Sequence, residues 1–247
     1  MIVGFCGSGS MAAAMARGWR GELDGMLFSD AGSGRARELA AEVGGEAVGN
    51  AELAARADAV VLAVKPAALE RAAAELAGAR EVVSVLAATP LDRLRAALPG
   101  ARVLRTMPNL AVEVRRGVLC AAGEAAPEVR AALQALGRVV ELDEELFDAA
   151  TAVMGCSPAY LALLAERLVA AGERAGLSPE AARELVVETA AGTAELLRGR
   201  EPAELRAAVA SPGGATEAGL QALERAGAPE AFTAAVEASL QRMGAMR

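Results

Sequence analysis

The order of apolar and polar positions divides the chain into two halves of different character. In the first half, short apolar runs alternate with segments whose apolar residues recur at helical spacing. Strands are predicted at residues 2–6, 26–29, 59–64, 81–86, 102–105, 117–122 and 138–142. Helical segments separate most of these runs, and such alternation favours a doubly wound parallel sheet with helices on both faces.

After residue 144 the strand pattern ends and helical periodicity continues to the end of the chain. Helices are predicted at residues 145–154, 158–175, 179–197, 202–209, 216–226 and 229–243. We therefore divide the chain into an α/β domain, residues 1–150, and an all-α domain, residues 151–247. The helical domain has few large side chains, so its own core is thin. We expect it to serve dimerisation by packing against a second copy, as an intertwined homodimer that leaves a higher homo-oligomer open.

Composition narrows the possible functions. The net charge of −7 and the lack of a dense basic run argue against binding to nucleic acid. No histidine is present, which excludes histidine-based triads and most catalytic metal sites. The three cysteines are widely spaced and predict no disulfide framework or metal site. We found no charged leader and no apolar run of roughly 18 residues, so we expect a cytoplasmic protein without a membrane partner.

A glycine-rich turn follows the first predicted strand. Its residues are Gly7, Ser8, Gly9, Ser10 and Met11, followed by Ala12, and a helical pattern continues from there. The pattern G-x-G-x-x-A between a strand and a helix is typical of dinucleotide-binding, Rossmann-like domains. In this interpretation Gly7 makes the turn, Gly9 lets a pyrophosphate approach the backbone, and Ala12 allows close helix–strand packing.

The end of the second predicted strand bears on the choice of cofactor. Asp30 lies where an acidic residue usually bonds the adenosine ribose of NAD and repels the additional phosphate of NADP. Arg35 and Arg37 follow closely and are able to bind that phosphate, or they only solvate the next helix. The sequence therefore predicts NADPH or NADH, with Asp30 favouring NADH.

Further candidate residues follow later strands. Asn50 begins a short helix, and the strand at 59–64 leads into Val64, Lys65 and Pro66. Lys65 is the only lysine in the chain and lies at the carboxyl end of a strand, where ligands bind in open α/β sheets. A structural ion pair with a nearby carboxylate is the alternative for Lys65. The strand at 102–105 is followed by Met107, Pro108 and Asn109.

A second turn, Ser211-Pro212-Gly213-Gly214-Ala215-Thr216, opens a helix in the all-α half. Pro212 and the two glycines favour a tight bend, and the first amides of the helix have no partner within it. Such amides bind anions, and a small carboxylate is the natural guest. The hydroxyls of Ser211 and Thr216 add hydrogen-bonding groups.

These motifs together resemble the pyrroline-5-carboxylate reductase family. The resemblance covers the whole chain and rests on the S-P-G-G-x-T run, the V-K-P strand end, the M-P-N triplet and the P-A-Y sequence at 158–160. It implies NADPH- or NADH-dependent reduction of 1-pyrroline-5-carboxylate to L-proline, the last step of proline biosynthesis, by hydride transfer to a cyclic imine.

The resemblance also implies roles for individual residues. Asn50 would contact the cofactor ribose and Lys65-Pro66 would line its cleft, while Thr216 would bond the ring nitrogen of the substrate. The amides of Gly213, Gly214 and Ala215 would hold the substrate carboxylate. Alanine replaces a common threonine at position 215 and a common glycine at position 88.

Two other classes of protein are alternatives to this family. A β-hydroxyacid dehydrogenase of similar build requires a catalytic lysine in the helical half, and no lysine follows Lys65. A reductase-like paralogue that binds nucleotide but is silent, or that acts on another cyclic imine, is the alternative function.

Overall fold

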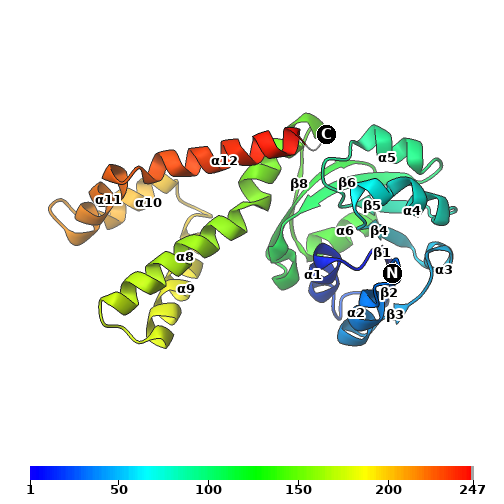
Figure 1. Cartoon of the computed structure of the whole chain (residues 1–247), viewed down its shortest axis with the longest axis horizontal. Coiled ribbons are helices and arrows are strands. Elements are labelled where there is room, and N and C mark those ends of the chain that lie inside the picture. Colours follow the sequence, from blue (N-terminus) through cyan, green and yellow to red (C-terminus); the bar gives the residue numbers. More distant parts are fainter. Residues whose placement is uncertain (246–247) are drawn as a thin grey trace. The chain divides into compact units, whose positions relative to one another are not determined.

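The computed structural model describes residues 1–245 and contains one eight-stranded sheet. The strand order is β3-β2-β1-β4-β5-β6-β7-β8 (Figure 1). The strands are β1 (Ile2–Cys6), β2 (Gly25–Ser29), β3 (Glu46–Ala47), β4 (Ala59–Leu62), β5 (Glu81–Ser84), β6 (Arg102–Pro108), β7 (Gly117–Gly123) and β8 (Gly137–Glu141). The predicted α/β fold with a doubly wound sheet is confirmed, and the short edge strand β3 is an addition to it.

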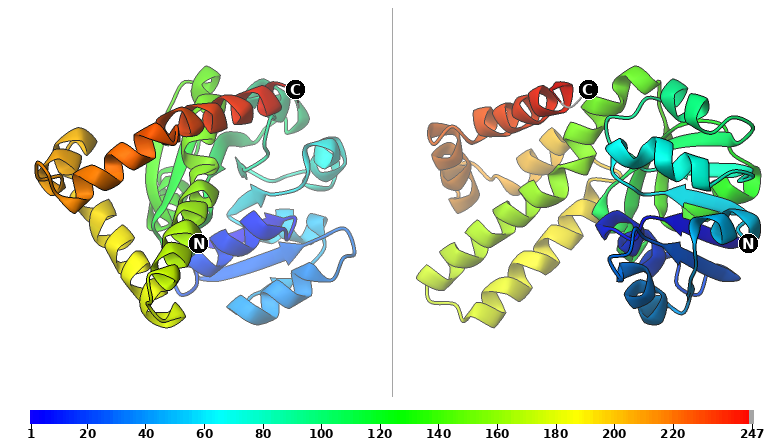
Figure 2. Two further views of the ribbon diagram at one scale, coloured as in Figure 1. Left: turned by 60° about the vertical axis from the view of Figure 1, so that its left-hand side comes forward. Right: turned by 45° about the vertical axis from the view of Figure 1, so that its right-hand side comes forward.

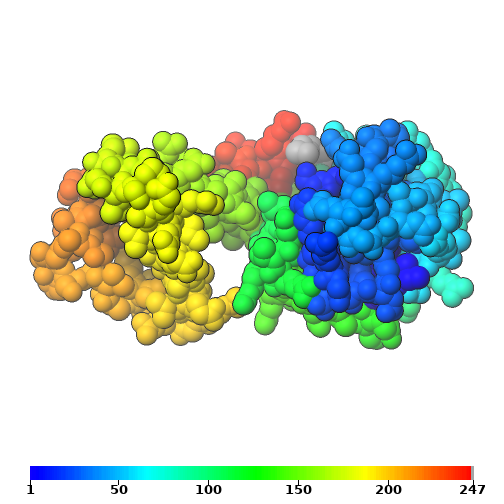
Figure 3. Space-filling view, turned by 90° about the horizontal axis from the view of Figure 1, so that it is seen from below, coloured from blue at the N-terminus to red at the C-terminus, as the bar shows by residue number. Residues whose placement is uncertain are grey.

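Alternate residues of the strands supply two cores on opposite faces of the sheet. Phe5 of β1 packs with the helices α1 (Ser10–Gly18), α2 (Arg35–Val43) and α6 (Pro127–Ala135). Its neighbour Cys6 packs with α3 (Asn50–Arg56), α4 (Leu69–Glu75) and α5 (Leu91–Ala97). This period of two is what a strand buried on both faces requires. The space-filling view shows these segments, coloured blue to green, as one continuous body (Figure 3).

One strand pair departs from the predicted parallel sheet. β7 runs antiparallel to β6, with Met107 opposite Cys120, and β8 then runs parallel to β7. Only the short helical turn η2 (Leu110–Val114) separates β6 from β7. A parallel crossover needs a dozen or more residues, so this connection permits only a reversal of direction.

The chain divides into two compact units. The first comprises residues 1–158 together with the end of the chain from Leu240, and the second comprises Ala159–Ser239. Between β8 and the helical half lie three short elements in the first unit, η3 (Glu144–Leu146), α7 (Phe147–Ala150) and the π-helical turn η4 (Thr151–Gly155). We had expected one regular helix over 145–154.

The second unit is built from helices. They are α8 (Ser157–Arg174), α9 (Pro179–Leu196), α10 (Pro202–Val209), α11 (Ala215–Arg225) and most of α12 (Ala228–Gly244). The helices α8 and α9 are joined by a short turn as a hairpin, and in the left view of Figure 2 they diverge from that turn. Ser178 caps α9 by accepting a hydrogen bond from the Ala181 amide, as its position before Pro179 predicts.

The second unit buries very little of its own apolar surface. Among its residues only Ala182 and Leu205 are buried apolar side chains. Large apolar side chains exposed in the same unit are Leu161, Leu163, Leu164, Leu168, Leu177, Leu185, Val187, Leu196, Leu197, Val209, Leu223 and Phe232. Exposed apolar surface of this extent is typical of a protein interface.

The apolar character of this region also corrects one sequence-based expectation. Among the described residues, one helical stretch, Glu144–Arg174, is long and apolar enough to cross a membrane by length and composition, because it contains an 18-residue window with a mean hydropathy of 1.3. We had expected no such stretch because we looked for an uninterrupted apolar run. An average over a window tolerates the few charged residues that interrupt it.

One alanine in the first unit adopts a strained backbone conformation. Ala88 lies in the turn after β5 with a φ of +51°, in the left-handed region that disfavours a Cβ. We expect Ala88→Gly to raise the free energy of unfolding by about 0.5–1 kcal/mol, because relief of this strain exceeds the entropy cost of glycine. Denaturant titration measures the change.

The matched control is Ala87→Gly. Ala87 is the exposed neighbour in the same turn and does not have a positive φ. We expect its replacement to lower stability by about 0.5–1 kcal/mol, because only the entropy cost applies there. Equal effects of the two substitutions would contradict the strain at Ala88.

Candidate functional site

The carboxyl ends of the central strands meet at one edge of the sheet. The Gly7 amide donates to the Ser29 carbonyl at 3.1 Å, which joins the ends of β1 and β2. The Ala63 amide donates to the Cys6 carbonyl at 2.8 Å, which joins the ends of β4 and β1. The strand order changes direction between β1 and β4, and ligands of open α/β sheets bind at such a switch point.

The glycine-rich turn lies at this switch point. Gly7 has a φ of +98°, and a Cβ there would lie 2.6 Å from the Ala63 carbonyl oxygen. At Gly9, by contrast, a Cβ would meet no atom of the described residues within 4 Å. Gly7 is therefore required by the fold itself, whereas Gly9 keeps open the space in front of the α1 N-terminus. Ala12 is fully buried, as close helix–strand packing requires.

A surface hollow of about 480 Å³ lies beside the turn. Its walls include Ser8, Gly9 and Ser10 from the turn and Arg35 from the start of α2. The first amides of α1 have no partner within the helix and so offer hydrogen bonds to an anion. The hollow therefore has the groups that a pyrophosphate needs. Met11, the last residue predicted for this turn, packs partly buried against the core.

Asp30 follows β2, but its carboxylate faces its own loop. Oδ1 accepts hydrogen bonds from the amides of Gly32 at 2.6 Å and Ser33 at 3.0 Å. Oδ2 accepts from the Ala36 amide at 2.8 Å and from the Ser33 hydroxyl at 3.1 Å. These bonds, the one from Ala36 above all, lower the pKa of Asp30 below its usual range.

Asn50 also makes contacts within the first unit. Its Oδ1 accepts a hydrogen bond from the Ser29 hydroxyl, and its Nδ2 donates to Glu75 at 2.5 Å. These contacts tie α3 and α4 to the end of β2. Contact with a cofactor ribose stays a prediction for Asn50.

Cys6, at the end of β1, is inert as a nucleophile. Burial is the main cause that raises the pKa of its thiol to about 11.

The V-K-P segment reaches the same edge from β4. Val64 is partly buried, and Pro66 starts the short turn η1 (Pro66–Ala68). Lys65 is exposed, and among the ion pairs of residues 1–245 none involves it. The alternative of a structural ion pair for Lys65 therefore finds no support in the structure.

The M-P-N triplet lies at the end of β6. Met107 and Pro108 are strand residues, paired with Cys120 and Leu119 of β7. Asn109 is nearly buried, and its side chain joins two segments of the chain. Its Nδ2 donates to the Met154 carbonyl at 3.2 Å, and its Oδ1 accepts from the Val118 amide at 3.1 Å. Asn109 thereby anchors the π-helical turn η4 to β7. Cofactor contact by these three residues stays a prediction.

A buried charge next to the triplet was missed by the sequence reasoning. Arg105 is 3% exposed, pairs with Glu144 at 2.5 Å, and lies 4.5 Å from the centre of the Phe147 ring. Glu144 also accepts a hydrogen bond from the Leu91 amide at 2.6 Å. The position of Glu144 at the end of the predicted strand pattern was the only sequence signal that it pairs with a residue of the sheet. The network fixes the segment that leads out of the sheet.

The Ser211–Thr216 turn lies in the second unit and forms the start of α11. The Gly214 amide donates to the Ser211 carbonyl at 2.9 Å, and the Gly213 amide donates to the Glu217 carboxylate at 2.7 Å. The carboxylate of Glu217 therefore already binds the Gly213 amide, which is one of the three amides predicted to hold the substrate carboxylate. Glu217 was missed because the cap residue of α11 is Gly214, which lacks the hydroxyl side chain that a capping box requires.

Thr216 lies beside an apolar hollow. The hollow has a volume of about 400 Å³, and Thr216 and Thr193 are the hydroxyl-bearing residues in its wall. Most of the remaining wall is apolar, with Leu196, Leu205 and Leu220 among its residues. A hollow of this kind suits a small ligand whose polar atoms are few and are met by placed hydroxyl and amide groups.

The switch point, the glycine-rich turn and the open space at Gly9 define a dinucleotide-binding protein of the Rossmann class. Comparison with known proteins then identifies the family. Residues 144–246 match the model described as pyrroline-5-carboxylate reductase dimerisation, and residues 2–88 match the one described as NADP oxidoreductase coenzyme F420-dependent. The chain belongs to the pyrroline-5-carboxylate reductase family.

Individual relatives agree with this assignment. The pyrroline-5-carboxylate reductase of Thermus thermophilus is 40% identical, over 84% of this chain and 82% of the relative. That of Pseudomonas aeruginosa is 37% identical, over 97% of this chain and 94% of the relative. The crystal structure of Plasmodium falciparum pyrroline carboxylate reductase with NADP bound has a TM-score of 0.85 and 26% identity, and covers 100% of this chain and 98% of that one.

The two glycines of the turn give a matched pair of variants. We expect Gly9→Ala to change the free energy of unfolding by less than about 1 kcal/mol. It should nevertheless weaken dinucleotide binding at least tenfold, because its methyl group enters the space reserved for the ligand. Gly7→Ala should weaken binding and also destabilise the fold by about 2 kcal/mol or more, because of the backbone clash and the positive φ.

Calorimetric binding of NADPH and NADH, combined with thermal unfolding, measures both effects. Unchanged binding by the Gly9→Ala protein would contradict the placement of the ligand at this turn.

Proposed function

We propose that the protein reduces 1-pyrroline-5-carboxylate to L-proline with NADPH or NADH. The observation that carries this proposal is the presence, in one chain of this family, of a dinucleotide turn and an S-P-G-G-x-T helix start beside a hollow. The reaction adds a hydride to the carbon of a C=N bond and a proton to its nitrogen. It needs positioning and charge complementarity more than a catalytic acid of unusual pKa, so a chain without histidine is able to carry it out.

The residues at the sheet edge fit a nicotinamide dinucleotide. The space over Gly9 admits a pyrophosphate, and the amides of Ser10 and Met11 at the start of α1 would hold it. The bound cofactor supplies the hydride. Val64, Lys65 and Pro66, which follow β4, and the end of β6 at Met107–Asn109 would line its cleft. Asn50 would contribute through the end of β2, where it is already fixed by Ser29 and Glu75.

The Ser211–Thr216 turn would hold the substrate. The substrate carboxylate would take the place of Glu217 at the Gly213 amide and would add the Ala215 amide, whose position at the start of α11 leaves it outside the helical pattern. The Thr216 hydroxyl would hydrogen-bond the ring nitrogen. Ser211 shapes this turn through its carbonyl, which accepts from Gly214.

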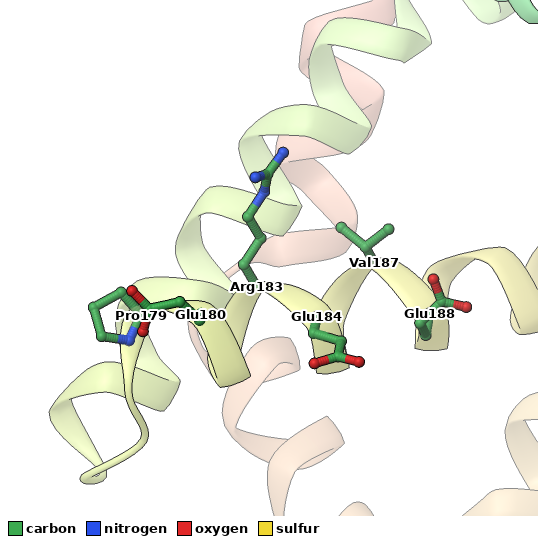
Figure 4. Close-up of a pocket in the computed structure, with 6 residues that line it drawn as sticks. All are labelled: Pro179, Glu180, Arg183, Glu184, Val187 and Glu188. Carbon is green, nitrogen blue, oxygen red and sulfur yellow. The ribbon is translucent and has the colours of Figure 1, made fainter.

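We infer that the protein is a homodimer formed through the helical region. The match to a dimerisation model over residues 144–246 and the exposed apolar residues of α8 and α9 support this. An open surface hollow on α9 is lined by Pro179, Glu180, Arg183, Glu184, Val187 and Glu188 (Figure 4). In such a dimer, the exposed apolar side chains of Glu144–Arg174 and of the neighbouring helices would be removed from water. A higher oligomer would be assembled from such dimers.

We also propose that the protein acts in the cytoplasm. Its three cysteines, Cys6, Cys120 and Cys156, are free thiols, as expected in a reducing compartment. The proposed reaction draws on reduced nicotinamide cofactor, which a cell holds in that compartment.

Turnover tests the proposed function directly. We expect saturable oxidation of NADPH or NADH by the purified protein when 1-pyrroline-5-carboxylate is added, followed at 340 nm. A protein that binds cofactor but oxidises neither form with this substrate would favour the silent paralogue. Turnover with a different cyclic imine alone would favour the altered substrate.

Thr216 is the side chain on which the substrate assignment can be tested. A hydrogen bond to a charged nitrogen contributes about 1.5–3 kcal/mol. We therefore expect Thr216→Val to lower kcat/KM for the imine by roughly one to two decades, while the KM for the cofactor is unchanged. Thr216→Ser, which keeps the hydroxyl, should retain most of the activity.

The matched control is Thr193→Val, which removes the other hydroxyl from the same hollow. We expect it to change kcat/KM by less than about threefold. Equal losses in the Thr193→Val and Thr216→Val proteins would argue against the role of Thr216.

A further inference from the structure

The loop between β2 and α2 is organised around Asp30. Its carboxylate accepts four hydrogen bonds, two at each oxygen, from the amides of Gly32, Ser33 and Ala36 and from the Ser33 hydroxyl. Gly32 and Gly34 have φ values of +91° and +83°, which let the chain curl around the carboxylate. Among residues 1–245 no other side chain caps α2, so Asp30 supplies the cap from outside the helix.

This arrangement leaves Asp30 poorly placed to act on a ribose. An acidic residue that selects NADH uses its free carboxylate oxygens to accept hydrogen bonds from the two ribose hydroxyls. Here both oxygens already accept bonds from donors of the same loop. The surrounding amide dipoles also offset part of the negative charge that would repel an additional phosphate.

The loop that Asp30 folds carries a cation to the cofactor hollow. Arg35, the first residue of α2, lines the hollow together with Ser8, Gly9 and Ser10. Within residues 1–245, Arg35 makes no ion pair, whereas Arg17 in the same wall pairs with Glu42 and Glu113. Glu38 also lines the hollow and is the carboxylate there without such a pair.

We propose that Asp30 is a positioning residue that folds residues 31–36 into a receptor for the 2′-phosphate of NADPH, with Arg35 as the charged partner. The proposal rests on the proposed use of a reduced nicotinamide dinucleotide and goes beyond it by assigning the preferred form. The sequence alone suggests a preference for NADH on the basis of Asp30. The proposal reverses that preference because the Asp30 carboxylate already accepts hydrogen bonds from its own loop. The carboxylate of Glu38, which lines the same hollow, would repel the 2′-phosphate and reduce the preference for NADPH.

The direction in which Asp30→Asn changes NADPH affinity distinguishes the two possible roles of Asp30. If Asp30 organises the loop, Asp30→Asn puts an amide donor against backbone amides and should weaken NADPH binding at least tenfold and NADH binding less. If Asp30 bonds the ribose, the same change should weaken NADH binding and strengthen NADPH binding. Dissociation constants for both cofactors and the two KM values report the difference, and the second pattern would overturn the proposal.

A probe that lacks the nicotinamide tests the phosphate contact alone. We expect adenosine 2′,5′-bisphosphate to bind at least tenfold more tightly than adenosine 5′-monophosphate. Arg35→Gln should remove most of that ratio, and Glu38→Gln should increase it. Arg80→Gln, the same charge change at an exposed position just before β5, at the opposite edge of the sheet, is the matched control and should alter the ratio less than twofold. An Arg35→Gln protein with an unchanged ratio would contradict the proposal.

Failure of this inference and failure of the proposed function give different results. A protein that turns over 1-pyrroline-5-carboxylate with a preference for NADH contradicts only the inference. A protein that binds neither cofactor contradicts the proposed function as well. Asp30→Asn should be compared with the parent protein by thermal unfolding, and Arg35→Gln, which removes no hydrogen bond of the loop, supplies the test if Asp30→Asn does not fold.

Discussion

The candidate site depends on the close approach of the Gly7 turn to the end of β4. A Cβ at Gly7 would lie 2.6 Å from the Ala63 carbonyl oxygen, a separation that real side chains do not adopt. Because the backbone is able to pass there, α1 starts directly above the switch point of the sheet, and its first amides face the space over Gly9. The ends of β1, β2 and β4 are joined by backbone hydrogen bonds at the same place. The dinucleotide site is therefore a consequence of backbone packing more than of any charged side chain.

The second unit depends on a different constraint. Its helices have almost no buried apolar side chains of their own, and their large apolar residues are exposed. Such a unit cannot gain enough from its own core to offset the entropy of ordering its chain. In the proposed homodimer, a second copy of the chain packed against the helices would supply the missing burial. The Ser211–Thr216 turn lies in this unit, so the proposed substrate contacts would depend on dimerisation for their rigidity.

Most of the fold could be predicted because apolar periodicity follows directly from burial. Phe5 and Cys6 face opposite cores, and the run that contains them is apolar throughout. The antiparallel β6–β7 pair could not be predicted from that pattern, because the direction of a strand depends on the length and path of its connection. The π-helical turn η4 was also missed, since it is held by a long-range bond from Asn109 to Met154.

The candidate site was predictable where backbone geometry decides, and less so where side chains choose partners. Gly7 makes the tight turn that its spacing suggests, whereas the approach of a pyrophosphate at Gly9 stays a prediction. Asp30 and Glu217 illustrate the limit: each carboxylate binds nearby backbone amides, and spacing alone does not tell whether a polar group is free or already engaged. The roles of the other predicted site residues depend on ligand contacts and stay predictions.

The fate of a labelled hydride would distinguish a reductase from a protein that only binds the cofactor. The protein would be incubated with 1-pyrroline-5-carboxylate and NADPH that carries deuterium in the transferred position of the nicotinamide C4. We expect L-proline with one deuterium at C5, formed in equal amount to the oxidised cofactor. Unlabelled proline, or oxidised cofactor without proline, would contradict hydride transfer to the imine by this protein.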